Sequence, residues 1–385
     1  MRHFEYFGDA EIERLFFRAP EQFTVDSDPQ ILAMALGATL YSPGTRPNLA
    51  KDIAKQAARG VVSLVVCLED SISDEDVPAA EINVVEQLRA YAQTDASGPL
   101  LFIRVRAAYQ IPLIVEGLGE HLSVLSGFVI PKFLGETGVE YLDAVEAASA
   151  AAGRQVYAMP VLESPELAFR ESRGGELATI AEVLAKYRST VLAVRIGATD
   201  LSSAYGLRRN RELTIYHVHV VADVISDIVN VLGRAGDAGY LITGPVWEYF
   251  AQHERIFKPQ LRETPFVEHD ERTLRLKMIN ADLDGLIREV VLDQANGLTG
   301  KTVIHPSHVA AVHALSVVSH EEYVDAQEIL GATTGGVNAS QYRNKMNEAK
   351  PHRAWAQQLI RRARVFGVVR EEITYVDVLS ASHEL

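Results

Sequence analysis

The chain has 385 residues, of which 48% are hydrophobic and 23% are charged, an ordinary composition for a globular protein with a large core. The formal net charge of −14 disfavours a nucleic-acid surface, which needs a clustered basic face. No apolar run approaches the roughly 18 residues of a membrane span, and the first residues lack the apolar core of a signal peptide. The single cysteine, Cys67, excludes an internal disulfide and fits a reducing compartment, so we expect a cytoplasmic protein that binds neither membranes nor nucleic acids.

Eight short apolar runs follow one another along the chain, and each ends in polar or turn residues. In chain order the runs are 39–44, 61–70, 99–106, 126–132, 155–164, 190–200, 239–245 and 301–307. Runs such as VSLVVCL are continuously hydrophobic rather than alternating, which is typical of parallel strands buried on both faces. Apolar residues at helical spacing predict helices between the runs, among them 48–59, 78–94, 139–152 and 177–187.

A strand followed by a helix, repeated eight times, predicts the α/β class and an eight-stranded (β/α)8 TIM barrel. An open doubly wound sheet is the alternative, but no GxGxxG turn follows the first strand, as a dinucleotide-binding sheet would favour. We expect residues 1–35 to form an N-terminal extension that caps the bottom of the barrel. The barrel domain is predicted at 36–318, with an insertion at 246–300, because this connection is too long for a simple crossover. Residues 319–385 are predicted to form a helical C-terminal extension.

The polar residues that end the runs are the candidate site residues, because the active site of a TIM barrel lies at the carboxyl ends of its strands. They are Arg46, Glu69, Asp70, Arg104, Arg106, Lys132, Glu163, Asp200 and His305. Glu163 and Asp200 end consecutive strands, and two carboxylates that leave room for waters and substrate oxygens are typical of an Mg²⁺ site. Each carboxylate alone could instead cap the following helix. Acidic and basic groups converge on the carboxyl end of the barrel, its mouth. This convergence favours a site for a metal-bound anion.

The motif order resembles that of a known enzyme family. The run LYSPGTRPNLAKDIAKQAARGVVSLVVCLED resembles the opening of the citrate lyase β-subunit family, within the HpcH/HpaI aldolase superfamily. The resemblance continues through IRVR, VIPKF, VLESPE and RIGATDLS to GLTGKTVIHPSHV, in the family's order over residues 39–309, and more weakly to about residue 365. It implies a TIM barrel and an Mg²⁺-dependent carbon–carbon bond lyase of aldol or Claisen type. The implied substrate is a 2-keto or 3-hydroxy acid or its thioester, which reacts through a metal-stabilised enolate.

The resemblance also implies roles for individual residues. Glu163 and Asp200 match the Mg²⁺ ligands, and Glu69 matches the acid that holds metal-bound water or orients the arginine. Arg104 matches the arginine that grips the carboxylate or enolate oxygen of the keto acid, a task that suits a planar fork. The implied catalytic residues are Arg104, Glu69 and Glu348, and the implied substrate-binding residues are Arg46, Lys51, Arg104 and Lys132.

Two of these positions have alternative interpretations. Lys132 could form an internal salt bridge with Glu69 or Asp70, or it could be a Schiff-base lysine. The Schiff base is disfavoured, because such an enzyme would not need the carboxylate pair. His305 and Pro306 form a turn for which a structural role is slightly favoured over catalysis.

Several departures place the chain in a divergent branch of the family. Arg106 stands where the family has asparagine, and His308 replaces a glutamine. Glu348 lies where relatives carry an aspartate that reaches a neighbouring subunit's site, so we expect a homo-oligomer, specifically a trimer, with Glu348 as the base. The chain resembles divergent lyase-like barrels that occur in bacteria beside tellurite- or stress-resistance clusters.

The substrate is expected to be a small free keto or hydroxy acid rather than a coenzyme A thioester. A basic groove for such a carrier is available at Arg46, Lys51, Arg208 and Arg209, but the insertion could close it. Two other functions stay open, a phosphoenolpyruvate-mutase-like or carboxylase-like enzyme and a non-catalytic barrel that binds a metabolite. The presence of Glu163, Asp200 and Arg104 counts against the second of these, although a fold alone never fixes function.

Overall fold

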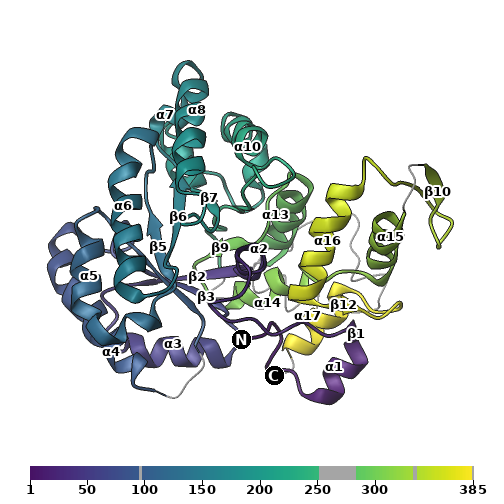
Figure 1. Ribbon diagram of the computed structural model, residues 1–385, viewed down its shortest axis with the longest axis horizontal. Helices are drawn as coiled ribbons and strands as arrows, with labels where there is room; N and C mark the ends of the chain where they lie inside the picture. Colours follow the sequence, from purple (N-terminus) through teal and green to yellow (C-terminus); the bar gives the residue numbers. More distant parts are fainter. Residues whose placement is uncertain (95–97, 251–282, 333–335, 384–385) are drawn as a thin grey trace.

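The computed structural model describes residues 1–94, 98–250, 283–332 and 336–383. Its centre is one parallel sheet of eight strands in the order β8-β7-β6-β5-β4-β3-β2-β9 (Figure 1). The strands are β2 Ala38–Pro43, β3 Ser63–Cys67, β4 Leu100–Arg104, β5 Gly127–Ile130, β6 Tyr157–Leu162, β7 Val194–Ile196, β8 Ile242–Thr243 and β9 Lys301–Val303. Seven of the eight predicted runs contain one of them, and the first run, 39–44, overlaps β2, which begins one residue earlier.

The two ends of this sheet meet at Gly244, directly after β8. The Gly244 N–H donates to the carbonyl of Gly300 at 3.1 Å, and the Thr302 N–H donates to the carbonyl of Gly244 at 3.1 Å. These backbone hydrogen bonds join β8 to β9, so no open edge remains between them. The predicted TIM barrel is therefore confirmed, and the open doubly wound sheet is excluded.

Helices surround the barrel on its outside. They are α3 Leu49–Ala58, α4 Val77–Ala92, α5 Gln110–Leu118, α6 Gly135–Ala152, α7 Pro165–Ala168, α8 Arg170–Lys186, α9 Ala198–Ser203, α10 His219–Leu232, α13 Leu283–Ala295 and α14 Ser307–Ala314, with short 3-10 turns η1 Asp74–Asp76, η2 Gly119–Val124 and η3 Ile215–His217. The first turns of α8 are polar, so the apolar spacing starts at Leu177 although the helix begins at Arg170. Arg173 holds this first part by donating to the carbonyls of Leu167 and Ala168.

The predicted insertion 246–300 contains α13, which leads from the segment after β8 back to β9 as a crossover helix. Residues 251–282 of this insertion lie outside the described residues, so its extent stays a prediction. Among the described residues, none of the helices has the length and apolarity needed to cross a lipid bilayer.

The two ends of the chain pack against each other beside the barrel. The N-terminal elements are α1 Asp9–Leu15, β1 Phe16–Arg18 and α2 Pro29–Ala35, and the C-terminal ones are α15 His320–Gly331, β10 Val337–Ala339, β11 Met346–Glu348, α16 Arg353–Phe366, β12 Val368–Val369 and α17 Tyr375–His383. β1 pairs with β12 in antiparallel fashion, and the ring of His3 lies 4.3 Å from the ring of Phe366. The buried residues of α15 and α16 form a small core of their own, which separates this lobe from the barrel (Figure 1). The division at residues 35 and 318 stays a prediction.

Candidate active site

Charged side chains from four neighbouring strands meet at the carboxyl end of the barrel. Arg104, the last residue of β4, is at the centre of this cluster and is largely buried. Its Nη2 atom lies 2.7 Å from Oε2 of Glu69, which follows β3, and 2.9 Å from Oε1 of Glu163, which follows β6. Asp70 is farther away, at 3.6 Å. The two close contacts use the same nitrogen, so the other guanidinium nitrogens are not engaged by these carboxylates.

Lys132 follows β5 and connects the same two carboxylates by a different route. Its backbone is left-handed, with φ of 46°, a conformation that residues other than glycine rarely adopt. In this conformation the Lys132 N–H donates to Oε1 of Glu163 at 2.9 Å, while Nζ lies 2.7 Å from Oε1 of Glu69. Nζ is also 3.5 Å from Asp70. The predicted internal salt bridge of Lys132 is therefore present, and these acidic partners raise the pKa of its ammonium against the lowering effect of burial.

Glu163 is buried, and its carboxylate accepts from Arg104 and from the Lys132 N–H rather than capping a helix. A Cβ atom at Gly197, after β7, would lie 2.0 Å from Oε2 of Glu163, so only glycine fits beside this carboxylate. Burial raises the pKa of Glu163 to about 7, and the nearby charges of Asp200 and Glu69 act in the same direction. Arg104 and the Lys132 N–H oppose this rise without cancelling it. Burial thus disfavours the charged form of this carboxylate, and a nearby cation would stabilise it.

Asp200 lies in the first turn of α9 and faces the same cluster. Burial raises the pKa of Asp200, and the charge of Asp70 adds to the rise, whereas Lys132 and Arg104 lower it. Asp70 itself has a lowered pKa: burial acts to raise it, but its contacts with Glu69, Arg104 and Lys132 outweigh that effect. Four carboxylates and two cations therefore share this mouth.

The donor set at the mouth fits a hard divalent cation. Within the described residues no group of three or more His, Cys, Asp or Glu side chains is arranged as a complete metal cage. Two carboxylates are enough for Mg²⁺, which keeps several waters and takes substrate oxygens as further ligands. Burial is the main cause that raises the pKa of Glu163 and of Asp200, and the charge of Asp200 adds to the rise for Glu163 as that of Asp70 does for Asp200. A divalent cation between the two carboxylates would oppose these effects.

The remaining residues that the sequence indicated lie outside this cluster. Arg46 is exposed and pairs with Asp52, with Nε 2.6 Å from Oδ2, and Lys51 is exposed on α3. Nδ1 of His305 lies 2.7 Å from the hydroxyl of Ser307, at the start of α14, which agrees with a structural role. His308 is fully buried.

Arg106 acts on the loop that follows β3. It donates to the backbone carbonyls of Leu68, Glu69 and Ile72 at 3.1 to 3.2 Å, and it pairs with Asp74. These bonds fix the backbone from which Glu69 reaches into the cluster. Arg106 is thus neither a free surface charge nor a second guanidinium beside Arg104.

Glu348 does not reach the cluster of its own chain. It lies in β11, on the hairpin formed by β10 and β11, and its side chain is exposed. The hairpin projects from the C-terminal lobe on the side away from the barrel (Figure 1). Any contribution of Glu348 to catalysis would therefore have to be made in another subunit.

Two residues inside the barrel were missed by the sequence analysis. Arg195 of β7 and Tyr41 of β2 lie below the cluster, and the guanidinium carbon of Arg195 is 5.6 Å from the centre of the Tyr41 ring. The signal for Arg195 was available, since it is a charge in the middle of the apolar run TVLAVRIG. Tyr41 carried no such signal, because an aromatic residue in a buried strand is ordinary.

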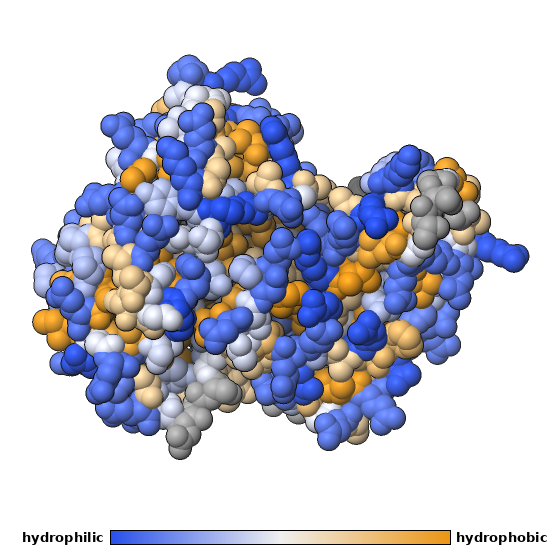
Figure 2. Space-filling view, viewed as in Figure 1, coloured by the Kyte–Doolittle hydropathy of each residue, from blue (hydrophilic) through white to orange (hydrophobic). Residues whose placement is uncertain are grey.

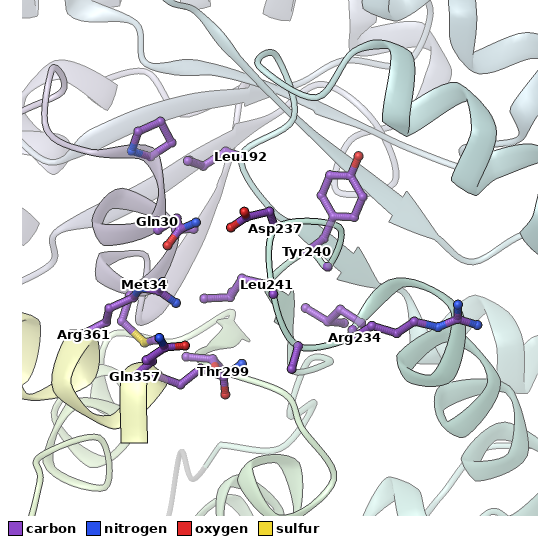
Figure 3. Close-up of a pocket in the computed structure, with 18 of the residues that line it drawn as sticks. Gln30, Met34, Leu192, Arg234, Asp237, Tyr240, Leu241, Thr299, Gln357 and Arg361 are labelled. Atoms are coloured by element: carbon purple, nitrogen blue, oxygen red, sulfur yellow. The ribbon is translucent and has the colours of Figure 1, made fainter. Parts of the chain in front are cut away.

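A pocket of about 470 Å³ lies at the opposite end of the barrel (Figure 3). It opens between the residues before β7, β8 and β9, such as Leu192, Leu241 and Thr299, and the helices α2 and α16. Gln30 and Met34 from α2 and Gln357 and Arg361 from α16 form one side, and Asp237 and Tyr240 lie across from them. None of the predicted site residues lines this pocket, so its size does not make it the active site.

Comparisons with known proteins agree with the fold. The profile of a family described as C–C bond lyases of the TIM-barrel fold matches residues 30–368. An L-malyl-CoA/β-methylmalyl-CoA lyase of Rhodobacter capsulatus is 23% identical over 342 residues, which cover 84% of this chain and 93% of the lyase.

Solved structures with the same fold include two from this group of enzymes. A citrate lyase from Burkholderia xenovorans LB400 has a TM-score of 0.60 at 15% identity and covers 89% of this chain and 95% of its own. The protein CitE from Mycobacterium tuberculosis, in complex with magnesium, acetoacetate and coenzyme A, has a TM-score of 0.52 at 20% identity, over 86% of this chain and 99% of its own. At these identities the similarity establishes the fold alone.

Proposed function

The chain belongs to the family of C–C bond lyases of the TIM-barrel fold, and we propose that it cleaves or forms a carbon–carbon bond in a small 2-keto or 3-hydroxy acid with the help of Mg²⁺. This family is related to the citrate lyase β subunit and to malyl-CoA lyase. The membership agrees with the resemblance found in the motifs. The observation that carries the proposed site is the contact of Arg104 with both Glu69 and Glu163, beside Asp200, at the catalytic end of the barrel.

Glu163 and Asp200 are the residues that would hold the metal ion. When bound, Mg²⁺ supplies Lewis-acid stabilisation of the negative charge that develops on the substrate's carbonyl oxygen. Arg104 and the Lys132 N–H both donate to Oε1 of Glu163, which leaves Oε2 as its unoccupied oxygen. These two bonds orient the carboxylate before any ligand binds.

Arg104 is proposed to hold the carboxylate of the keto acid. One of its nitrogens already contacts Glu69 and Glu163, and its planar fork keeps the remaining nitrogens at fixed angles. In cleavage of a 3-hydroxy acid a base takes the hydroxyl proton, and the alkoxide oxygen becomes the carbonyl of one fragment as the carbon–carbon bond breaks. The electron pair of that bond forms the enolate of the other fragment. Arg104 would neutralise part of that charge, and Glu69 would keep the guanidinium aimed at it.

Lys132 is proposed to act as a fixed ammonium rather than as a Schiff-base nucleophile. A lysine must lose its proton to attack a carbonyl, and environments that favour this reaction lower the pKa of the amine. Here Glu69 and Asp70 raise the pKa of Lys132 instead. This charge state supports the metal-assisted mechanism over the Schiff-base alternative.

The general base is proposed to be Glu348 of a neighbouring subunit in a homotrimer. Support comes from its exposure on a projecting hairpin and from large hydrophobic side chains that are exposed close to it in sequence, Val337, Met346 and Trp355. Hydrophobic residues also lie at the surface over the C-terminal helices (Figure 2). Such exposed apolar residues favour burial against another protein surface.

A free acid is proposed as the substrate rather than its coenzyme A thioester. Two of the four cations that could bind a carrier's phosphates are already paired, Arg46 with Asp52 and the buried Arg209 with Glu289. The thioester is the second candidate, because the Rhodobacter relative is named as a malyl-CoA lyase. Saturable binding of coenzyme A by the apo protein would favour this second candidate.

Binding and turnover measurements test the proposal together. Calorimetry with glyoxylate, pyruvate and oxaloacetate should show binding that requires Mg²⁺. Turnover should be seen as release of the same keto acids from a panel of hydroxy acids. Glu163→Gln should abolish both results, whereas Glu166→Gln, an exposed acid in the next turn of chain, should change neither. Mg²⁺-independent binding, or equal results for the two variants, would refute the assignment.

A further inference from the structure

Arg195 is a buried cation without a carboxylate partner in the part of the chain that the structure describes. Its side chain crosses the interior of the barrel and is only 1% exposed. It donates to the hydroxyls of Thr302 at 2.5 Å and Thr39 at 3.4 Å, and its Nη1 lies 3.9 Å from the sulfur of Met159. Within the described residues its Nε has no partner, and no acid lies within salt-bridge distance of it. A buried charge of this kind is costly unless a function or a ligand compensates for it.

Tyr41 lies between Arg195 and the charged cluster. Tyr41 and Thr39 point to the same side of β2, since side chains two apart on a strand share a face, and Tyr41 is nearer to the carboxyl end. The Arg195 guanidinium lies against its ring, at 5.6 Å from the centre. Its side chain is partly exposed, and its hydroxyl makes no hydrogen bond with another described residue. Burial raises the pKa of Tyr41, while Arg195 and Arg104 lower it, so the hydroxyl keeps its proton and can donate it in a hydrogen bond.

We propose that Tyr41 and Arg195 form the floor of the anion site. The Tyr41 hydroxyl donates a hydrogen bond to an anionic oxygen of the bound keto acid. Arg195 is a positioning residue that fixes the Tyr41 ring from below and places a positive charge under the substrate. This inference rests on the proposed function, and it adds a contact from inside the barrel to those from Arg104 and the metal site. It also accounts for an arginine that is buried with no acidic partner among the residues that the structure describes.

The charges at the mouth indicate which keto acids this floor favours. The residues assigned to the mouth comprise four carboxylates and two cations, so a divalent cation leaves them balanced. Arg195 then adds one positive charge in a region of low dielectric constant. A monocarboxylate such as glyoxylate or pyruvate balances that charge, so these acids should bind better than the dicarboxylate oxaloacetate.

Calorimetry on the full chain with Mg²⁺ separates this inference from the proposed function. Tyr41→Phe removes only the hydroxyl and should weaken glyoxylate and pyruvate binding about tenfold, as expected for one hydrogen bond to a charged group. Arg195→Met should weaken binding by at least as much, and Arg195→Lys should restore part of the loss. The affinity for Mg²⁺ alone should stay unchanged in Tyr41→Phe and Arg195→Lys, which keep the charge, and should not fall in Arg195→Met, which removes a positive charge near the metal site. A general disturbance of the barrel would lower the Mg²⁺ affinity in all three variants.

The chain offers a matched control at the opposite end of the barrel. Arg188 lies over the ring of Tyr240 at 3.9 Å, so Arg188→Met and Tyr240→Phe make the same chemical changes away from the mouth and should leave keto-acid binding unchanged. If the wild-type protein binds no keto acid with Mg²⁺, the proposed function fails and this inference fails with it. If the wild type binds and Tyr41→Phe and Arg195→Met bind equally well, only the inference is overturned.

Discussion

Arg104→Lys separates the chemical role of this residue from its structural role. Lysine keeps a positive charge between Glu69 and Glu163, which lie 2.7 and 2.9 Å from a single guanidinium nitrogen. The nitrogens that are left to grip a substrate carboxylate are lost, together with their planar arrangement. We expect a loss of about 2 kcal/mol of transition-state stabilisation, or about 30-fold in kcat/KM. The unfolding temperature should move by less than about 3 °C, because the charge pairing is retained.

Steady-state kinetics on the keto or hydroxy acid that binds, together with thermal unfolding, measures both quantities. Arg46→Lys is the matched control, since Arg46 is exposed and already paired with Asp52, and its kinetics should change little. Arg106→Lys should act differently, lowering the unfolding temperature, because Arg106 holds three backbone carbonyls of the β3 loop. Equal losses of activity for Arg104→Lys and Arg46→Lys, or a large drop in stability for Arg104→Lys, would refute this reasoning.

Three further outcomes are expected. Glu163→Gln should lose most of the Mg²⁺ affinity seen by calorimetry, and affinity equal to that of the wild type would exclude Glu163 as a ligand. Burial lowers the pKa of His3 from 6.5 to about 3. Below pH 6.5 the unfolded chain therefore binds a proton that the folded chain excludes. From this group the free energy of unfolding should fall by about 2 kcal/mol between pH 7.5 and pH 5.0. Thermal unfolding of His3→Phe should show a smaller drop over that range, whereas the exposed control His219→Gln should behave like the wild type. Light scattering at micromolar concentration should give a trimer, and a monomer would remove the proposed role of the β10–β11 hairpin.

Local patterns along the chain were enough to predict the barrel. Continuous apolar runs such as that of β3 reflect burial on both faces, and this property does not depend on which strands become neighbours. The polar residues at the ends of the runs then had to lie at one end of the barrel, because parallel strands place their carboxyl ends together. The meeting of Glu69, Arg104, Lys132 and Glu163 was predictable on this basis, and the structure brings them into contact.

The partners of individual charges were not predictable from the same patterns. Arg46 and Arg106 looked equivalent to Arg104 as strand-end cations. Arg46 instead pairs with Asp52 of the following helix, α3, and Arg106 binds backbone carbonyls. Side-chain partners depend on where loops turn and on which side chains come within about 4 Å, and neither is encoded in hydrophobic periodicity. The same holds for the contacts between the N-terminal and C-terminal segments, which are more than 300 residues apart in sequence.

The sequence by itself determined the fold class, the family and the end of the barrel at which the charged residues gather, because these follow from periodicity, strand order and motif spacing. Only the tertiary structure decided that Arg195 is buried without an acid among the described residues and that Tyr41 lies between it and the mouth. That arrangement arises when the barrel closes and strands β7, β9 and β2 surround one interior space. Register and closure fix which side chains share that interior, so its charge balance is a property of the folded barrel.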